Sequence, residues 1–414
     1  MTLVPQTLDE INYWDLDMFE HGDPHEAWRI QREQAPVWWH DRDGGEPFWS
    51  VARFDDALAV LSDPLLFSSQ RDGIIVRTDA ALESGPPGAG LGIQPMIHTD
   101  PPRHAPLRSI ISHNFRPRSI AQLEDQIRAA AVECLERAAD ERDVDFVIDI
   151  AHQVPAAITF ALMGVPEDMW SRLADLQHQT VTATDPEFTH GRSPQEAAAA
   201  ASLELHTYFA QIIQERMEEP GDDLLSQFLQ GRIDGEELSW MQVVAEAGLL
   251  LAGGLDTTRA AASAGGILPL IQNPDQLKLL QDDPSLIGGA TDEFVRWASP
   301  ITSEARTATR DCELAGQKIS EGDRVVVWSP SSNRDEAHFE DPYRFDVLRN
   351  PRHLGFAFGE HYCLGVHLAR LTLKVEFEEL LSRFSGFELT GEPARVRSNF
   401  VNGLKHLPVR LTPK

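Results

Sequence analysis

One cysteine, Cys363, stands in a run of glycine, phenylalanine and histidine residues, and an amphipathic helix pattern begins directly behind it. Gly359 and Gly365 lie four residues before and two residues after it, where glycine lets the backbone turn tightly and approach a flat ligand. The following helix would aim its N-terminal amides at the sulfur, which favours a thiolate. This pattern suits an axial metal ligand, although a buried cysteine in a turn is the plainer interpretation.

A second set of unusual residues interrupts residues 238–270, the longest helical pattern of the chain, which is apolar nearly all round. Gly253 and Gly254 cost up to ~1 kcal/mol each relative to alanine in a helix. Asp256 and Thr257 place a carboxylate and a hydroxyl in an apolar context. Small residues let a helix lie close to a flat ligand, and a hydroxyl opens a notch in the backbone bonding. The alternative is a kinked core helix with a satisfied threonine.

A third motif pairs His104 with Arg108, four residues apart and therefore on one face of a predicted helix. Two donor or cationic side chains on one face suit a carboxylate. The same spacing is common on solvated surfaces, and the preceding Asp100-Pro101-Pro102 makes the motif more specific.

The segment Phe356–Gly365, followed by Leu368-Ala369-Arg370, resembles the haem-binding signature of the cytochrome P-450 monooxygenases. The resemblance covers nearly the whole chain and implies heme b (iron protoporphyrin IX), with Cys363 as the thiolate ligand of the iron. The chain departs from the family at Ala357, where glycine is usual, and this exchange is expected to stiffen the loop.

The resemblance also assigns roles to the other motifs. Thr257 would hold dioxygen and ordered water, and Asp256 would relay protons to the distal oxygen as a general acid. Histidine and arginine side chains would contact the haem propionates. The residues expected to bind the cofactor are His104, Arg108, Arg306, Phe356, His361, Cys363 and Gly365.

Two further groups lie between these motifs. The resemblance makes Glu293 and Arg296 a structural clamp behind the haem, with Arg344 as the third member. Glu304 is unexpected so close to a haem: it either binds a polar end of the substrate or pairs with Arg306.

Composition excludes several classes of partner. Across 414 residues, 65 acids outnumber 36 Lys and Arg, and the net charge of -29 argues against nucleic acid and anionic membrane surfaces. Three cysteines at long spacings fit a reducing cytoplasm. Residues 1–35 are polar and contain no signal peptide or membrane-spanning run, so we expect a soluble, cytoplasmic protein.

The fold class expected is mainly α with smaller β-sheets (α+β), as one domain over residues 1–414, with haem between the long central helix and the Cys363 loop. Local patterns predict a hairpin, a loop over the substrate pocket, helices and a polar, mobile joint. These are Val37–His40 with Phe48–Val51, the loop at Ser84–Gly90, helices over 118–139 and Val144–Met163, a capped helix from Ser193 to Arg216, and the joint Thr180–Arg192.

The function expected is hydroxylation of an unactivated C–H bond with O2. No dinucleotide-binding motif follows a predicted strand, so electrons would come from NAD(P)H through a ferredoxin reductase and a [2Fe-2S] or similar ferredoxin. The residues expected to bind substrate are apolar or small: Leu249, Ala252, Gly253, Ile301 and Val401. They favour an aliphatic compound, and similarity to bacterial members suggests a sterol side chain, a terpenoid or a methyl-branched lipid.

Several alternatives stay open. The chain would otherwise be a secondary-metabolite tailoring oxidase, a peroxide-driven enzyme, a haem-thiolate isomerase, or a non-enzymatic recruitment module or haem sensor. The pair Asp256 and Thr257 argues against peroxide use, because peroxide arrives with its oxygens already reduced. A recruitment module would be expected to lose Cys363 or Thr257, and this chain has both.

Overall fold

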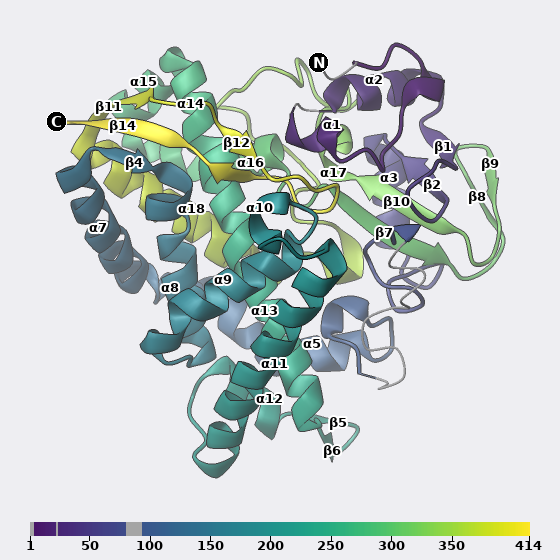
Figure 1. The fold of residues 1–414 in the computed structure, drawn as a ribbon, viewed down its shortest axis with the longest axis horizontal. Helices are drawn as coiled ribbons and strands as arrows, with labels where there is room; N and C mark the ends of the chain where they lie inside the picture. The colour runs from purple at the N-terminus through teal and green to yellow at the C-terminus, as the bar shows by residue number, and fades with distance from the viewer. Residues whose placement is uncertain (1–3, 22–23, 80–92) are drawn as a thin grey trace.

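The computed structural model describes residues 4–21, 24–79 and 93–414, and a long helix, α13 (Trp240–Ala260), runs through the middle of them (Figure 1). The loop predicted at Ser84–Gly90 lies outside the described residues. The other α-helices are α1 (Asp17–Glu20), α2 (His25–Gln34), α3 (Phe54–Ser62), α5 (His104–Ser112), α6 (Pro117–Ala121), α7 (Glu124–Glu141), α8 (Gln153–Met163), α9 (Trp170–Val181), α10 (Pro186–Thr189), α11 (Pro194–Glu218), α12 (Leu224–Gln230), α14 (Leu268–Gln272), α15 (Pro274–Asp282), α16 (Ile287–Ala298), α17 (Ser329–Ser332) and α18 (Val366–Arg383).

The largest sheet has five strands in the order β1-β2-β10-β7-β3, and it lies at the opposite end of the molecule from α7 and α8 (Figure 1). Its first two strands form the predicted hairpin, and β10 adds to β2 in parallel. The strands are β1 (Val37–His40), β2 (Phe48–Val51), β3 (Phe67–Ser68), β7 (Ser303–Ala308) and β10 (Arg324–Trp328).

The other sheets are small. A three-stranded sheet in the order β11-β14-β4 contains the C-terminal strands of the chain. Three further sheets have two strands each: β12-β13, β5-β6 and β8-β9. Their strands are β4 (Asp143–Asp145), β5 (Arg232–Ile233), β6 (Glu236–Glu237), β8 (Cys312–Leu314), β9 (Gln317–Ile319), β11 (Phe384–Leu389), β12 (Ala394–Arg395), β13 (Leu404–His406) and β14 (Pro408–Pro413). The expected mainly α fold with minor β structure is confirmed.

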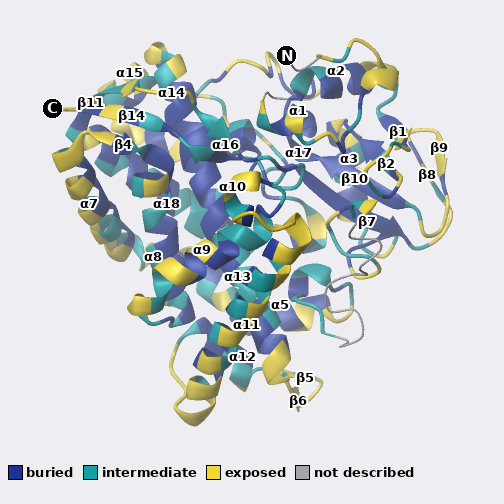
Figure 2. Ribbon diagram, viewed as in Figure 1, coloured by how far each residue is buried: buried dark blue, intermediate teal, exposed yellow. Residues whose placement is uncertain are grey.

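The core is helical around α13, and buried residues fill α13, α16 and β10 in Figure 2. One apolar cluster packs α13 against α8, α9, α11 and α12, and another packs α16 against α18. Ser193 caps α11 with a capping box to Glu196, as the pattern predicts, because each side chain satisfies a backbone N–H of the first turn.

Three predicted helices differ in detail. The helix expected over 118–139 is two helices, α6 and α7, separated at Gln122-Leu123. The helix expected from Val144 begins later, because Val144 pairs with Val409 in the C-terminal sheet and a π-helical segment, Phe146–Ala151, precedes α8. Beyond α13 the central helix continues as a π-helical segment, Ala261–Ile267, so its wide turn lies after Thr257 rather than at it.

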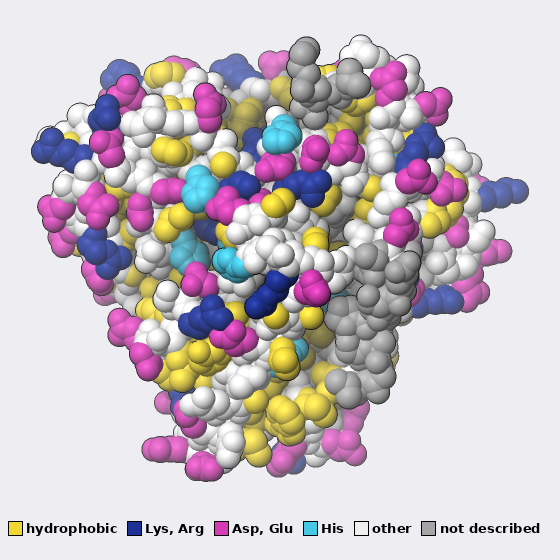
Figure 3. Space-filling model, in the orientation of Figure 1, with side chains coloured by type: hydrophobic (Ala, Val, Ile, Leu, Met, Phe, Trp, Pro, Cys, Tyr) yellow, Lys and Arg dark blue, Asp and Glu magenta, His cyan; other side chains and the backbone are white. Residues whose placement is uncertain are grey.

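One helical stretch among the described residues, Phe146–Met163, is long and apolar enough to cross a membrane. Because 61% of it is buried inside the molecule, it also has the character of a core helix. The face of the molecule drawn in Figure 3 carries many acidic side chains, in agreement with the net charge of -29.

Candidate active site

The loop before α18 holds Cys363 against the core by backbone contacts. The Cys363 N–H donates to the carbonyl oxygen of Phe356 at 3.0 Å, and a 3-10 helix, Gly359–His361, leads into the cysteine. Gly359 has φ +72°, and a Cβ there would overlap the carbonyl oxygen of Leu61, so glycine is required. Ala357 has φ +55°, a left-handed conformation that disfavours any residue with a Cβ.

The Cys363 thiol experiences opposing effects. Burial raises its pKa, whereas the N–H of Gly365 and the cations Arg108 and Arg370 lower it. The net shift is upward because burial is the largest effect, whereas the Gly365 N–H at the start of α18 acts in the expected direction and favours the thiolate. Metal binding releases this proton, because the thiolate is the ligand.

A cavity of about 330 Å³ lies between the Cys363 loop and α13, a size typical of small-molecule sites. All five residues predicted to bind substrate line it, together with the polar pair on the central helix and most of the predicted cofactor residues. The predicted residues in its wall are His104, Arg108, Leu249, Ala252, Gly253, Asp256, Thr257, Ile301, Phe356, His361, Cys363, Gly365 and Val401.

Arg306 is the predicted cofactor residue that does not line the cavity. It is buried behind Glu304, to which its guanidinium donates at 3.1 Å. The two side chains point to the same face of β7 because they are two residues apart on a strand. Of the two possibilities for Glu304, the structure therefore shows the pairing with Arg306.

The expected haem fits the donors on the cavity wall. His361 is 7% exposed, and neither of its ring nitrogens has a hydrogen-bond partner among the described residues. Burial, Arg306, His104 and Arg108 lower its pKa to about 2, so His361 is a neutral imidazole that can donate one hydrogen bond to an anion. His104 lies in T-shaped contact with His361, and Arg108 donates to the Tyr362 carbonyl at 2.7 Å. Two propionate carboxylates would satisfy these groups.

Thr257 and Asp256 differ in their surroundings. The Thr257 hydroxyl donates to the Gly253 carbonyl at 2.8 Å, as a hydroxyl that loosens the helix is expected to do. Asp256 is buried, and one carboxylate oxygen has no partner among the described residues. Burial alone would raise the pKa of Asp256, but Arg259 and His178 outweigh it and hold the pKa well below its usual range.

His178 and Arg259 are site residues that the sequence motifs did not indicate. Arg259 lies 2.7 Å from Asp256, and His178 Nδ1 lies 3.2 Å from the same carboxylate oxygen and 3.1 Å from Arg259. A protonated Nδ1 donates to Asp256, whereas a bare Nδ1 accepts from Arg259. Arg259 follows Asp256 by three residues and was visible as a helical neighbour, but His178 on α9 carries no local signal.

The predicted clamp is present with a different third member. Glu293 and Arg296 are fully buried and form two contacts of 2.6 and 2.7 Å. Arg344 is exposed, and only its carbonyl approaches Arg296, so its assignment as the third member is wrong. Arg349 Nε lies 3.5 Å from Glu293 instead, because the chain turns at the residues that follow Arg344.

The segment between α9 and α11 is tied to the C-terminal end of the chain by ion pairs. Val181, the last residue of α9, directly precedes this segment and lines the cavity. Asp185, which is fully buried, lies 3.0 Å from Lys405, and Glu187 lies 2.7 Å from His406. The stretch Thr180–Arg192, expected to be an irregular, mobile joint, thus contains α10. Ion pairs at Asp185 and Glu187 tie it to the C-terminal end of the chain.

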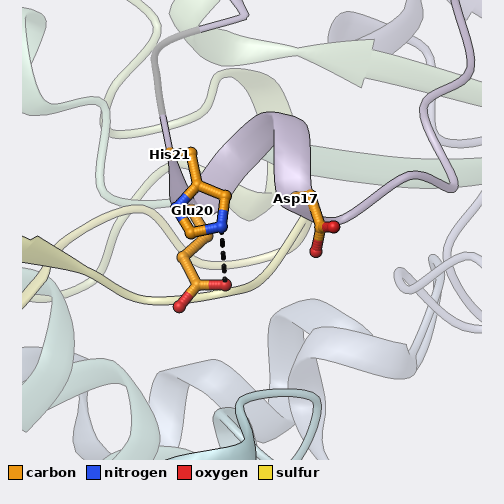
Figure 4. Close-up of side chains that lie close together, drawn as sticks. All are labelled: Asp17, Glu20 and His21. Atoms are coloured by element: carbon orange, nitrogen blue, oxygen red, sulfur yellow. Dashed lines mark ion pairs between the residues drawn. The ribbon is translucent and has the colours of Figure 1, made fainter. Parts of the chain in front are cut away.

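A surface group of Asp17, Glu20 and His21 offers three possible metal ligands close together, and Figure 4 shows His21 directed at Glu20. Cations of the protein already occupy this group. Arg397 lies 2.9 Å from Asp17, and Lys405 lies 3.4 Å from Glu20. The cluster is therefore an ion-pair network that joins α1 to the C-terminal strands.

Comparison with known proteins places this geometry in a family. Residues 90–407 match the cytochrome P450 family model. The chain is 40% identical over 418 residues, 98% of each chain, to the putative cytochrome P450 126 of Mycobacterium tuberculosis. It is 37% identical to linalool 8-monooxygenase of Pseudomonas putida, over 96% of this chain and 98% of the relative. It is 34% identical to steroid C26-monooxygenase of Mycobacterium tuberculosis, over 92% and 88%.

A solved structure agrees with these relatives. A Mycobacterium marinum cytochrome P450 in complex with pseudoionone superposes with a TM-score of 0.87 and 32% identity, covering 99% of this chain and 100% of that one. Two of these bacterial relatives are named as monooxygenases, one of linalool, a terpenoid, and one of the C26 position of steroids. The chain belongs to the cytochrome P450 family, and it is accordingly an oxidoreductase with heme b as its cofactor.

Proposed function

We propose that this protein hydroxylates a C–H bond of a terpenoid or of a steroid side chain, in the cytoplasm and as a single domain over residues 1–414. The observation that carries the proposal is one continuous cavity with Cys363 on one side and Gly253 and Thr257 on the other, walled mainly by apolar side chains. Apart from His104, Arg108 and His361, the described residues of the wall, including Ile301 and Val401, offer no cation that would fix an anionic substrate. Relatives named for linalool and for steroid C26 support the substrate class.

The residues of the chain divide the work. Bound haem supplies the activation of dioxygen and the oxidising power for the C–H bond. Cys363 would hold the iron by its sulfur, and His104, Arg108 and His361 would donate hydrogen bonds to the propionates, with Arg108 also supplying positive charge. Arg306 would join them if the propionate displaced Glu304, with which it is now paired.

Proton transfer falls to the central helix. The Thr257 hydroxyl, once released from the Gly253 carbonyl, orients water and donates a proton beside the ring. Because Asp256 is an anion at neutral pH, it acts as a relay rather than as the source of the proton. His178 Nδ1, within hydrogen-bonding distance of Asp256, is the group that passes protons to it.

The overall reaction consumes one O2, two electrons and two protons, and it yields one hydroxyl group in the product and one water. We propose that NAD(P)H supplies the electrons through a ferredoxin reductase and a [2Fe-2S] or similar ferredoxin. The absence of a dinucleotide-binding motif after a predicted strand supports an external donor.

The test is turnover of linalool and of cholesterol by the haem-loaded enzyme under two regimes. One contains NADPH, reductase, ferredoxin and isotopically labelled dioxygen, and the other contains hydrogen peroxide alone. We expect a product with one labelled oxygen in the first regime. The variant Cys363→Ala is the control, and it should lose both turnover and the carbon-monoxide difference band of thiolate-bound ferrous haem. Product formed only with peroxide would assign the chain to the peroxide-driven alternative.

A further inference from the structure

The face of α13 that lines the cavity becomes polar toward the N-terminal end of the helix. Leu249, Gly253 and Thr257 lie on this face and border the cavity. The same stripe continues toward the start of the helix with Glu246 and Gln242, which are polar but buried, at 0% and 3% exposed. The stripe therefore ends in two hydrogen-bonding side chains where an apolar continuation would pack more simply.

Burying the carboxyl group of Glu246 at this position costs free energy of folding. This residue lies between apolar neighbours such as Val243 and Ala247 on a helix surrounded by hydrophobic core. Among the residues that the structure describes, no ion pair is formed by its carboxylate, and the cation that acts on it is Arg103, whose charge lowers its pKa. Burial raises the pKa of Glu246 to about 7, although hydrogen bonds from Met96 and Gln242 act in the opposite direction. A buried, unpaired carboxyl group is costly unless its hydrogen bonds do something specific.

Those hydrogen bonds all serve one short stretch of backbone. The Met96 N–H donates to the two carboxylate oxygens of Glu246, at 3.0 and 3.2 Å. The amide of Gln242 donates both to Glu246, at 2.8 Å, and to the carbonyl oxygen of Gln94, at 2.7 Å. Two side chains one turn apart thus hold an N–H and a C=O of the same stretch against the central helix.

This stretch forms part of the cavity wall. A 3-10 helix begins at Met96 and ends at His98, and its first N–H has no partner within the helix itself. The side chains of Met96 and Ile97 line the cavity. No strand pairing holds residues 94–97 in the described structure, so side-chain contacts fix where these residues stand. Besides the bonds from α13, Gln94 donates to the Gln70 carbonyl oxygen at 3.1 Å.

We propose that Glu246 and Gln242 are positioning residues that set substrate selectivity, because they fix the wall formed by Met96 and Ile97. The inference rests on the proposed function in one respect, namely that substrate occupies this cavity. A purely structural role would stabilise the fold without altering which ligands fit. Three measurements separate the two roles: amide hydrogen exchange of residues 94–99, the preference between ligands of different size, and the free energy of unfolding.

The first measurement is amide hydrogen exchange of the haem-loaded enzyme. In Glu246→Gln one carboxylate oxygen becomes an NH2 group. The remaining oxygen can still accept from Gln242 and Met96 as Oε1 does now, but the NH2 group then faces the Met96 N–H in place of Oε2, so Met96 loses one of its two acceptors. Exchange over residues 94–99 should accelerate by about tenfold, while α5 stays unchanged. Gln242→Met, which keeps the side-chain length and removes the donor, should show the same local effect. Glu236→Gln, an exposed position on β6, is the matched control.

The second measurement uses two azole probes that bind the haem iron and differ in size, imidazole and 4-phenylimidazole. Both variants should bind imidazole within about twofold of the parent and should change the affinity for 4-phenylimidazole by about fivefold. This readout needs no turnover, so it stands even if linalool and cholesterol are not substrates. An unchanged affinity ratio in variants that fold normally, or exchange that accelerates equally across the whole chain, would overturn the proposal.

Discussion

Asp256 and Arg259, one turn apart on α13, lie 2.7 Å from each other, and His178 of α9 approaches both. The Arg259 guanidinium balances the charge of the buried Asp256 carboxylate beside the cavity. Together with His178 it holds the pKa of Asp256 low, so Asp256 stays ionised. An ionised relay between a permanent cation, Arg259, and an imidazole, His178, accepts and passes protons without holding one at rest. The pair is therefore suited to proton transfer toward Thr257, its neighbour in the sequence.

Replacing Asp256 by asparagine removes the relay and leaves Arg259 and His178 in place. We expect NADPH-driven turnover to fall by about a hundredfold, because a positioned proton-transfer group contributes at least that much. The solvent isotope effect on turnover should rise at the same time. Asp140→Asn on the exposed face of α7 serves as control, and a variant at Asp256 that turns over at the parental rate would contradict the assignment.

Thr257→Ala removes the hydroxyl that now donates to the Gly253 carbonyl. Substrate binding, followed spectrally, should persist, because the hydroxyl is a small part of an apolar wall. Product formed per NADPH consumed should drop roughly tenfold, with hydrogen peroxide released in its place. Thr257→Ser retains the hydroxyl and should restore most of the coupling. Equal coupling in the alanine and serine variants would show that the hydroxyl does not guide protons.

Much of the site was predictable because its residues form contiguous motifs. Cys363 and His361 share one loop, and Asp256 and Thr257 share one turn, so local chain geometry brings each set together. His178 and Arg349 were not predictable, because helix packing and a long irregular segment bring them to their partners. The break in the helix expected from Val144 was missed for the same reason, since its strand pairing with Val409 is a contact between distant residues.

The departure at Ala357 has a measurable effect on stability. Its φ of +55° costs about 1–2 kcal/mol for a residue with a Cβ, and part of this is recovered by the stiffer unfolded chain. We expect Ala357→Gly to raise the free energy of unfolding of the haem-loaded protein by about 0.5–1 kcal/mol. Gly359→Ala, where a Cβ meets Leu61, should lower it by at least about 2 kcal/mol. Urea titration measures both, and a destabilised Ala357→Gly would show that the alanine methyl is needed.

Glu376 on α18 makes stability depend on pH. It is fully buried, neither carboxylate oxygen has a hydrogen-bond partner among the described residues, and burial raises its pKa well above the usual value. A raised pKa in the folded state favours folding at low pH, and this contribution is lost as pH rises above the unfolded value of about 4.3. Glu376→Gln should therefore stabilise the protein more at pH 8 than at pH 5, by at least about 1 kcal/mol. An equal change in the free energy of unfolding on Glu376→Gln at the two pH values would refute this.

The ion pairs of Asp185 with Lys405 and of Glu187 with His406 join the segment after α9 to the C-terminal strands, next to Val181 in the cavity wall. If ligands pass this segment, the attraction between these charges must be broken on entry and again on departure. Dissolved ions weaken the more exposed pair by screening. Raising ionic strength should then quicken arrival and release of a bulky azole alike, in stopped-flow traces, while the equilibrium constant stays constant. The two ion pairs would then slow both association and dissociation of the ligand and leave its affinity unchanged.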